Sequence, residues 1–293
     1  MRIFSHAVIG LLWVLHWLPL PVLARLGRGF GGLLYFFGKA RRHVVKVNLR
    51  LCFPELDESQ RDDLARRHYA VLGRSALERG VAWWASEARL RRIVKVEHLE
   101  RLRAIQAQGR PIVLLVPHFV GLDMCGTRMA MEFDGMSVYA HQKDPVFDRW
   151  LLHGRTRFGD QVMLSRSDGV RTTVRAMRTG RSLYYLPDMD FGRKDSIFVP
   201  FFGVPAATIT GLSRLARLAD AAVVPSMSRM LADGSGYVME IGEEWVGFPT
   251  GDVEADTAYM NAWIESAVRT MPEQYYWVHR RFKTRPEGVP SPY

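Results

Sequence analysis

The chain has 293 residues, of which 48% are hydrophobic, so it can bury a large core in one big domain or two small ones. Forty Lys and Arg against 30 Asp and Glu give a formal net charge of +10, which suits an anionic partner such as nucleic acid, acidic lipid or an acidic carrier protein. The two cysteines, Cys52 and Cys125, are too few for a disulfide framework and too scattered for a zinc site.

The first 38 residues differ in composition from the rest. Residues 7–24, AVIGLLWVLHWLPLPVLA, are an uncharged segment of 18 residues, close to the minimum for a membrane-spanning helix. Pro19 and Pro21 interrupt it, so we expect a kinked, tilted or partly interfacial membrane anchor. The sequence VLA before Arg25 also fits the cleavage site of a signal peptide, but apolar residues resume at 33–37, as a retained anchor requires.

A basic region follows this segment. KARRH (39–43) favours a cytoplasmic position for what comes after it. Residues 39–110 contain 17 Lys and Arg against 9 Asp and Glu, which concentrates the positive charge there. We therefore predict an N-terminal membrane anchor over 1–38 and one domain over 39–293.

GRGFGG (27–32) matches the letters of the dinucleotide-binding pattern G-x-G-x-x-G. That fingerprint needs a strand before it and a helix after it. Here it interrupts a membrane-like stretch, so we predict no nucleotide site from it.

Apolar periodicity then alternates between the helical and the extended pattern. The predicted helices are 57–84, 97–108, 123–133, 144–158, 170–179, 210–220 and 256–271. The predicted strands are 111–116, 137–140, 161–165, 182–187, 221–230 and 237–241, the last two pairing through DGSG. Such alternation predicts an α/β fold, a sheet flanked by helices.

PHFVGLD (117–123) follows the buried strand 111–116 directly. His118 and Asp123 would point apart on a continuous helix and meet only if the chain turns, which Gly121 permits. In open α/β sheets ligands bind beyond the carboxyl ends of strands, where both His118 and Asp188 lie. The structural alternative is a loop histidine and an aspartate that caps a helix.

A neutral histidine hydrogen-bonded to a carboxylate is a general base of fixed tautomer and orientation. It could take a proton from an alcohol while that oxygen attacks an acyl carbonyl. No G-x-S-x-G nucleophile motif occurs, which favours direct transfer over an acyl-enzyme. A Cys125–His118 nucleophile is the alternative, although a free cysteine in a helix is more often a packing residue.

HFVGLD has the H-x-x-x-x-D signature and resembles that of the membrane acyltransferases that make glycerolipids and lipid A. Nearly the whole chain is similar to the late acyltransferases of lipid A biosynthesis. The resemblance is strongest over 184–211 and 272–293, and it is closer to the lauroyl-transferring branch than to the myristoyl one. It implies a glycerolipid-acyltransferase-like sheet with an N-terminal membrane-anchor helix.

The resemblance also implies the reaction. A lauroyl or myristoyl group would pass from acyl carrier protein to a hydroxyl of a Kdo-lipid A precursor, on the cytoplasmic side of the bacterial inner membrane, without a metal or other cofactor. His118 would be the base and Asp123 its orienting partner, while Asp188 would support the site or bind sugar. The arginines expected to bind phosphate or carboxylate are Arg155, Arg157 and Arg166.

Other functions are compatible with parts of the sequence. The chain could be an acyltransferase for a lysophospholipid or an ornithine lipid, or a non-catalytic basic membrane-binding protein, although a binder does not need His118 and Asp123. A secreted hydrolase would require cleavage of the leader.

Two further motifs have more than one interpretation. WVHRRFK (277–283) interleaves aromatic and basic residues as nucleic-acid binders do, but beside a membrane anchor we expect lipid head groups and no nucleic acid. The uncharged segment 197–207 is either the wall of an acyl pocket, a bilayer contact, or a buried strand with a loop.

Overall fold

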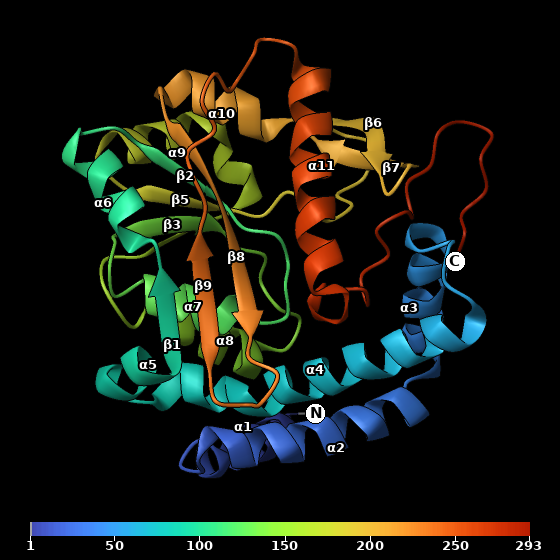
Figure 1. The fold of residues 1–293 in the computed structure, drawn as a ribbon. Coiled ribbons are helices and arrows are strands. Elements are labelled where there is room, and N and C mark those ends of the chain that lie inside the picture. Colours follow the sequence, from blue (N-terminus) through green and yellow to red (C-terminus); the bar gives the residue numbers. More distant parts are fainter. Residues whose placement is uncertain (1) are drawn as a thin grey trace.

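The computed structural model describes residues 2–293, except for the side chains of Arg2 and Arg166. A seven-stranded sheet forms the centre of the molecule (Figure 1). Its strands, in spatial order, are β1 (Val94–Glu97), β9 (Tyr237–Ile241), β8 (Ala222–Met230), β2 (Ile112–Leu115), β5 (Ser182–Tyr185), β3 (Gly135–Val138) and β4 (Val162–Leu164). All neighbouring pairs are parallel except β8 and β9.

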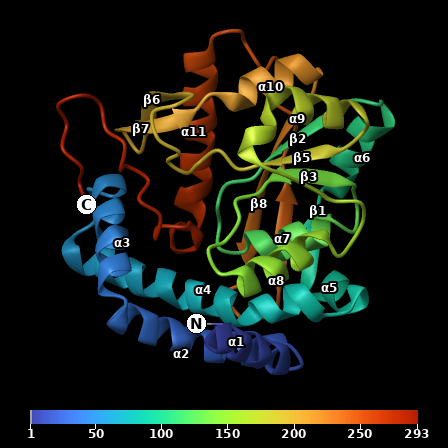
Figure 2. The same ribbon diagram turned by 180° about the vertical axis from the view of Figure 1, so that it is seen from behind.

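Helices cover the sheet and one end of it (Figures 1 and 2). They are α1 (Arg2–Leu15), α2 (Leu20–Phe37), α3 (Lys39–Cys52), α4 (Glu58–Trp84), α5 (Glu87–Ile93), α6 (Leu99–Ala107), α7 (Leu122–Met129), α8 (Pro145–Thr156), α9 (Gly169–Arg178), α10 (Gly211–Ala219) and α11 (Val253–Thr270). Two short 3₁₀ helices, Arg166–Asp168 and Pro272–Gln274, and a hairpin of β6 (Ser196–Phe201) and β7 (Val204–Ile209) complete the chain.

Strand β2 is buried on both faces, which explains its continuous apolar sequence. Ile112 and Leu114 pack into the core beneath α6, α7 and α8. Val113 and Leu115 point the other way, into the core beneath α9, α10 and α11. The predicted sheet flanked by helices is thus confirmed.

Elements with strong local signals lie where they were predicted. Helix α4 begins after Asp57, whose side chain accepts the N–H of Gln60 while the Gln60 side chain accepts the N–H of Asp57, a capping box. Strands β8 and β9 pair antiparallel as predicted. Strand β1 was not predicted, because four residues are too short for a clear pattern. Residues 197–207, for which a buried strand with a loop was one of three alternatives, lie in the β6–β7 hairpin.

The predicted anchor is divided into two helices. Helix α1 ends at Leu15 and α2 begins at Leu20, because Pro19 has no N–H to continue a helix and restricts the backbone of Leu18. Within residues 2–293, none of the helices has the length and apolar character needed to cross a bilayer. Both helices lie along the outer side of α4 (Figures 1 and 2).

Glycines allow α2 and α4 to approach closely. A Cβ atom at Gly31 of α2 would lie 2.1 Å from the carbonyl oxygen of Tyr69, and one at Gly73 of α4 would lie 2.1 Å from that of Gly27. Backbone therefore packs on backbone at this crossing. Gly27 and Gly31 of GRGFGG therefore serve helix packing, whereas a Cβ atom at Gly29 or Gly32 would have no neighbour within 4 Å.

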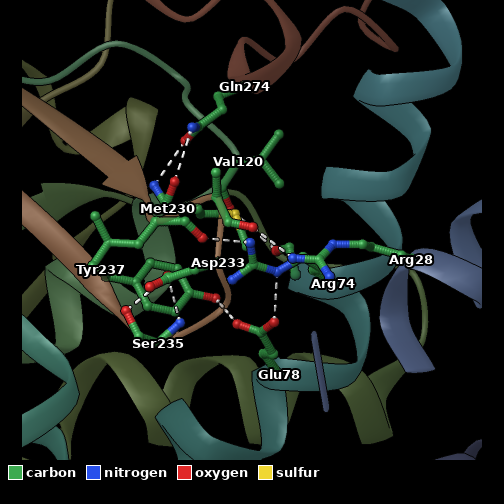
Figure 3. Close-up of polar contacts among 12 residues, drawn as sticks. Arg28, Arg74, Glu78, Val120, Met230, Asp233, Ser235, Tyr237 and Gln274 are labelled. Atoms are coloured by element: carbon green, nitrogen blue, oxygen red, sulfur yellow. Dashed lines mark hydrogen bonds and ion pairs between the residues drawn. The ribbon is translucent and has the colours of Figure 1, made fainter. Parts of the chain in front are cut away.

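A buried ion pair joins α4 to the β8–β9 hairpin (Figure 3). The Nε of Arg74 lies 2.9 Å from Glu78 Oε1, and its Nη1 donates to the carbonyl of Leu231 at 2.8 Å. The hydroxyl of Tyr237 donates to the other oxygen of Glu78. Burial raises the pKa of Glu78 above its usual value, although Arg74 and Tyr237 act against that rise.

We expect Arg74→Ala to lower the free energy of unfolding by about 3–5 kcal/mol, because it leaves the Glu78 carboxylate buried without its counter-charge. Arg67→Ala is the matched control on the same helix, since Arg67 pairs with Asp63 at the surface and surface pairs contribute little. Denaturant unfolding followed by circular dichroism measures both. Equal midpoints for the two variants would contradict the assignment.

Candidate active site

Strands β2 and β5 are parallel neighbours, with Leu115 opposite Tyr185, so the loops that follow them leave the sheet side by side. His118 lies in the first loop and Asp188 in the second. Nδ1 of His118 is 2.7 Å from Oδ1 of Asp188, and the backbone N–H of His118 donates to Oδ2 at 2.8 Å. The Asp188 carboxylate is buried, and each of its two oxygens accepts a hydrogen bond from His118.

The hydrogen bonds define the tautomer of His118. Burial alone would raise the pKa of Asp188, but the charge and hydrogen bonds of His118 outweigh that effect, and the pKa lies below its usual value. An ionised carboxylate only accepts hydrogen bonds, so Nδ1 carries the proton and Nε2 keeps its lone pair. His118 lines a cavity and is partly exposed to it, so it can act there as a base.

Asp123 was predicted to orient His118, and the structure corrects that pairing. Its Oδ1 accepts hydrogen bonds from Nε and Nη2 of Arg155, at 3.1 and 2.7 Å, and Arg79 lies 3.4 Å from Oδ2. Asp123 lies in the first turn of α7, between arginines of α4 and α8. Burial would raise its pKa, but Arg155 and Arg79 lower it to about 2. A catalytic role for Asp123 stays a prediction.

The predicted arginines lie in different surroundings. Arg155 lines the cavity, paired with Asp123 and stacked 5.4 Å from the centre of the Tyr139 ring. Arg157 donates to the carbonyl of Ala85 and lies over the Phe158 ring, and it is not among the cavity-lining residues. Burial lowers the pKa of Arg157. Its predicted role in substrate binding stays a prediction.

The predicted ligand Arg166 has its side chain outside the part of the chain that the structure describes. Its backbone begins the 3₁₀ helix Arg166–Asp168.

The segment after α11 supports the His118 loop, a role that sequence reasoning did not identify. Tyr276 N–H donates to the carbonyl of His118 at 3.0 Å, and Val120 N–H donates to that of Gln274 at 2.8 Å. The side chain of Gln274 binds both backbone groups of Met230 (Figure 3). The bonds of Tyr276 and Val120 span about 150 residues of sequence, and those between Gln274 and Met230 span 44, so no local pattern could reveal them.

The cavity beside His118 has a volume of about 1970 Å³, well above the roughly 300–1,000 Å³ typical of small-molecule sites. Most of its lining is apolar, and the lining includes side chains from three parts of the fold. Helices α1 and α2 contribute Leu11, Phe30 and Leu33. Strand β2 and the end of α7 with the residues after it contribute Ile112, Leu114, Met129, Ala130 and Phe133. Helices α9 and α10 contribute Val170, Thr173, Gly211 and Leu215.

The cysteine alternative is wrong. Cys125 is completely buried, and its Sγ faces the carbonyl of Val238 at 3.7 Å. Burial raises the pKa of this thiol far above its usual value, so it stays protonated and unreactive.

A histidine bound to a buried carboxylate, in the wall of a large and mostly apolar cavity, is the arrangement expected of an enzyme that acts on an apolar substrate. The sequence model of the bacterial lipid A biosynthesis acyltransferases matches residues 1–284, and the chain belongs to this family. It is therefore an acyltransferase of lipid A biosynthesis.

Three Escherichia coli (strain K12) proteins illustrate the similarity. The chain is 40% identical to the lipid A biosynthesis lauroyltransferase over 286 residues, 97% of this chain and 93% of that protein. It is 37% identical to the palmitoleoyltransferase over 286 residues, 97% and 92% of the two chains. It is 33% identical to the myristoyltransferase over 279 residues, 93% and 83% of the two chains.

Asp188→Asn should lower kcat about 10²–10⁴-fold, because an asparagine can donate to Nδ1 and stabilise the wrong tautomer of His118. Asp63→Asn is the control, since Asp63 pairs with Arg67 at the surface and neither residue lines the cavity. Steady-state acyl transfer by both folded variants gives the comparison. A fully active Asp188→Asn enzyme would show that the His118–Asp188 bond has no part in the reaction.

Proposed function

We propose that this enzyme transfers a lauroyl or myristoyl group from acyl carrier protein to a hydroxyl of a Kdo-lipid A precursor, with His118 as general base. The observation that carries the proposal is the hydrogen bond between Nδ1 of His118, a residue of the cavity wall, and the buried carboxylate of Asp188, which leaves Nε2 to accept a proton. The names of the E. coli relatives support the choice of acyl group. The net charge of +10 suits an acidic carrier protein as donor.

The reaction follows from the tautomer. Nε2 of His118 takes the proton of the acceptor hydroxyl while the hydroxyl oxygen attacks the thioester carbonyl carbon. The C–S bond of the resulting tetrahedral intermediate then breaks. The thiolate leaves and takes the proton from the imidazolium, which restores neutral His118. The buried carboxylate of Asp188 stabilises the imidazolium between these two steps.

We also propose that α1 and α2 hold the enzyme at the cytoplasmic surface of the inner membrane. Large apolar side chains of both helices and of the turn between them are exposed, which is the pattern of helices that lie in a membrane interface. They are Ile3, Phe4, Leu11, Trp13, Val14, Trp17, Val22, Leu26, Phe30, Leu33, Phe36 and Phe37. The neighbouring basic residues of 39–43 suit anionic lipid head groups. Residues 1–38 would then be an interfacial anchor.

His118→Ala should reduce transfer about 10²–10⁴-fold while the fold is kept, because the base is lost and little packing changes. The assay combines a Kdo-lipid A precursor with acyl carrier proteins that bear chains of different length. A folded variant that retains more than half of the wild-type rate would contradict the role of His118. No transfer from any carrier-bound donor by the wild type would contradict the proposed donor.

Trp17→Ser combined with Phe36→Ser should weaken binding to vesicles that contain anionic lipid, because both side chains are exposed apolar groups of the proposed interface. Transfer to a vesicle-embedded acceptor should fall more than transfer to a detergent-dispersed one. Val246→Ser is the control, because Val246 is 96% exposed and belongs to the loop between β9 and α11. That loop leads into the end of α11 that lies farthest from α1 and α2 (Figure 1). Unchanged vesicle binding of the double variant would show that another surface holds the membrane.

A further inference from the structure

A second histidine, His279, lies in the wall of the same cavity. It belongs to the WVHRRFK segment, which the proposed chemistry has not yet used. The backbone N–H of Asp190 donates to Nε2 of His279 at 3.0 Å. Asp190 is itself fixed, because its carboxylate accepts the N–H and the hydroxyl of Thr284 at 2.7 and 2.8 Å.

One loop therefore holds both imidazoles. Asp188 binds the ring of His118 through its carboxylate, and Asp190, two residues further along, binds the ring of His279 through its amide. A second link joins the two histidines from the other side, since Tyr276 N–H donates to the carbonyl of His118 and lies three residues before His279. These short connections make the two rings neighbours at the carboxyl ends of the strands.

The two rings have opposite tautomers. Nε2 of His279 accepts a hydrogen bond, so in the neutral ring the proton lies on Nδ1. No group within residues 2–293 hydrogen-bonds to this Nδ1, and it is not one of the fully buried atoms without a partner. His118 has its lone pair on Nε2. The cavity wall thus holds one imidazole that can accept a proton and one that can donate a hydrogen bond.

We propose that His279 is a second catalytic residue, which donates a hydrogen bond from Nδ1–H to the carbonyl oxygen of the acyl thioester as that oxygen becomes an oxyanion. This inference rests on the proposed acyl transfer. His279 keeps its proton throughout: the hydroxyl proton passes to His118 and then to the thiolate, while the O–C bond forms and the C–S bond breaks. A donor fixed before the reaction stabilises the developing charge without a cost of reorganisation.

The surroundings of His279 keep it neutral, as such a donor requires. Burial is the main cause that lowers its pKa to about 4, and the charges of Lys283, Arg281 and His118 lower it further, while Asp190 acts in the opposite direction. A neutral imidazole with a depressed pKa can polarise a carbonyl without giving up its proton. The Nδ1–H of His279 is then available as a hydrogen-bond donor while the ring stays neutral.

Three substitutions of His279 distinguish the role of its Nδ1 from that of its Nε2. His279→Asn keeps an amide N–H near the position of Nδ1, whereas His279→Gln keeps a carbonyl near Nε2 that can accept the Asp190 N–H. His279→Ala keeps neither. We expect Gln and Ala to lower kcat about 10²–10³-fold, as for loss of one oxyanion donor, with little change in KM. The Asn variant should be at least about tenfold faster than the Gln variant, with a kcat–pH profile shaped like that of the wild type.

The opposite order would overturn the proposal. If His279 only positions the loop through its hydrogen bond with Asp190, His279→Gln should retain activity and His279→Asn should lose it. Wild-type kcat in all three variants would overturn it as well. Thermal unfolding of each variant, and kcat of the variant His141→Ala, whose side chain is 76% exposed outside the cavity wall, serve as controls. Wild type and His118→Ala assayed in parallel test acyl transfer itself, so a failure of that function is recognised separately.

Discussion

The hydrogen bond from Nδ1 of His118 to the buried carboxylate of Asp188 connects the ends of two parallel strands, and the proposed chemistry depends on it. A buried carboxylate is stable only when it is paired and hydrogen-bonded, and here the histidine supplies both the ring and the backbone donor. The register of β2 against β5 places these groups together. A slip of one residue would turn the histidine to the other side of the sheet. Sheet pairing therefore defines the tautomer of the base.

Helix α4 links this site to the helices at the outer surface. Its Gly73 packs against the backbone of α2, one turn later Glu78 pairs with Arg74 beneath the β8–β9 hairpin, and Arg79 reaches Asp123 in the cavity wall. Ser75, between them, donates to the carbonyl of Val120 in the His118 loop at 3.1 Å. A single rigid element thus positions the apolar surface helices relative to the base. Under the proposed function, this fixes how far the site lies from the membrane.

The sequence predicted the features that depend on local residues. It did not predict the contacts that depend on which strands or helices are neighbours in space. The apolar run of β2, the helical periodicity of α4 and the β8–β9 pair are local features, and all three were predicted. The strand-end rule correctly placed both His118 and Asp188 outside the sheet. Their pairing was missed, because which strands are neighbours depends on the topology, and Asp123 is closer in sequence. The direction of Arg157, toward the end of α4, likewise depends on a contact with a residue 72 positions away.

Hydropathy counts apolar residues but does not show which of them are covered by other parts of the protein. For this reason the sequence predicted one membrane anchor over 1–38, whereas the structure has the two helices α1 and α2 there. Side chains such as Leu12 and Leu23 are buried in the core, whereas Trp17 and Phe36 are exposed, and a single spanning helix would not divide them this way. Leu11, Phe30 and Leu33 are both exposed and part of the cavity wall, so the apolar outer surface continues into the cavity. At a membrane surface, acyl chains of an acceptor could then stay in an apolar environment along the whole path while its hydroxyl reaches His118.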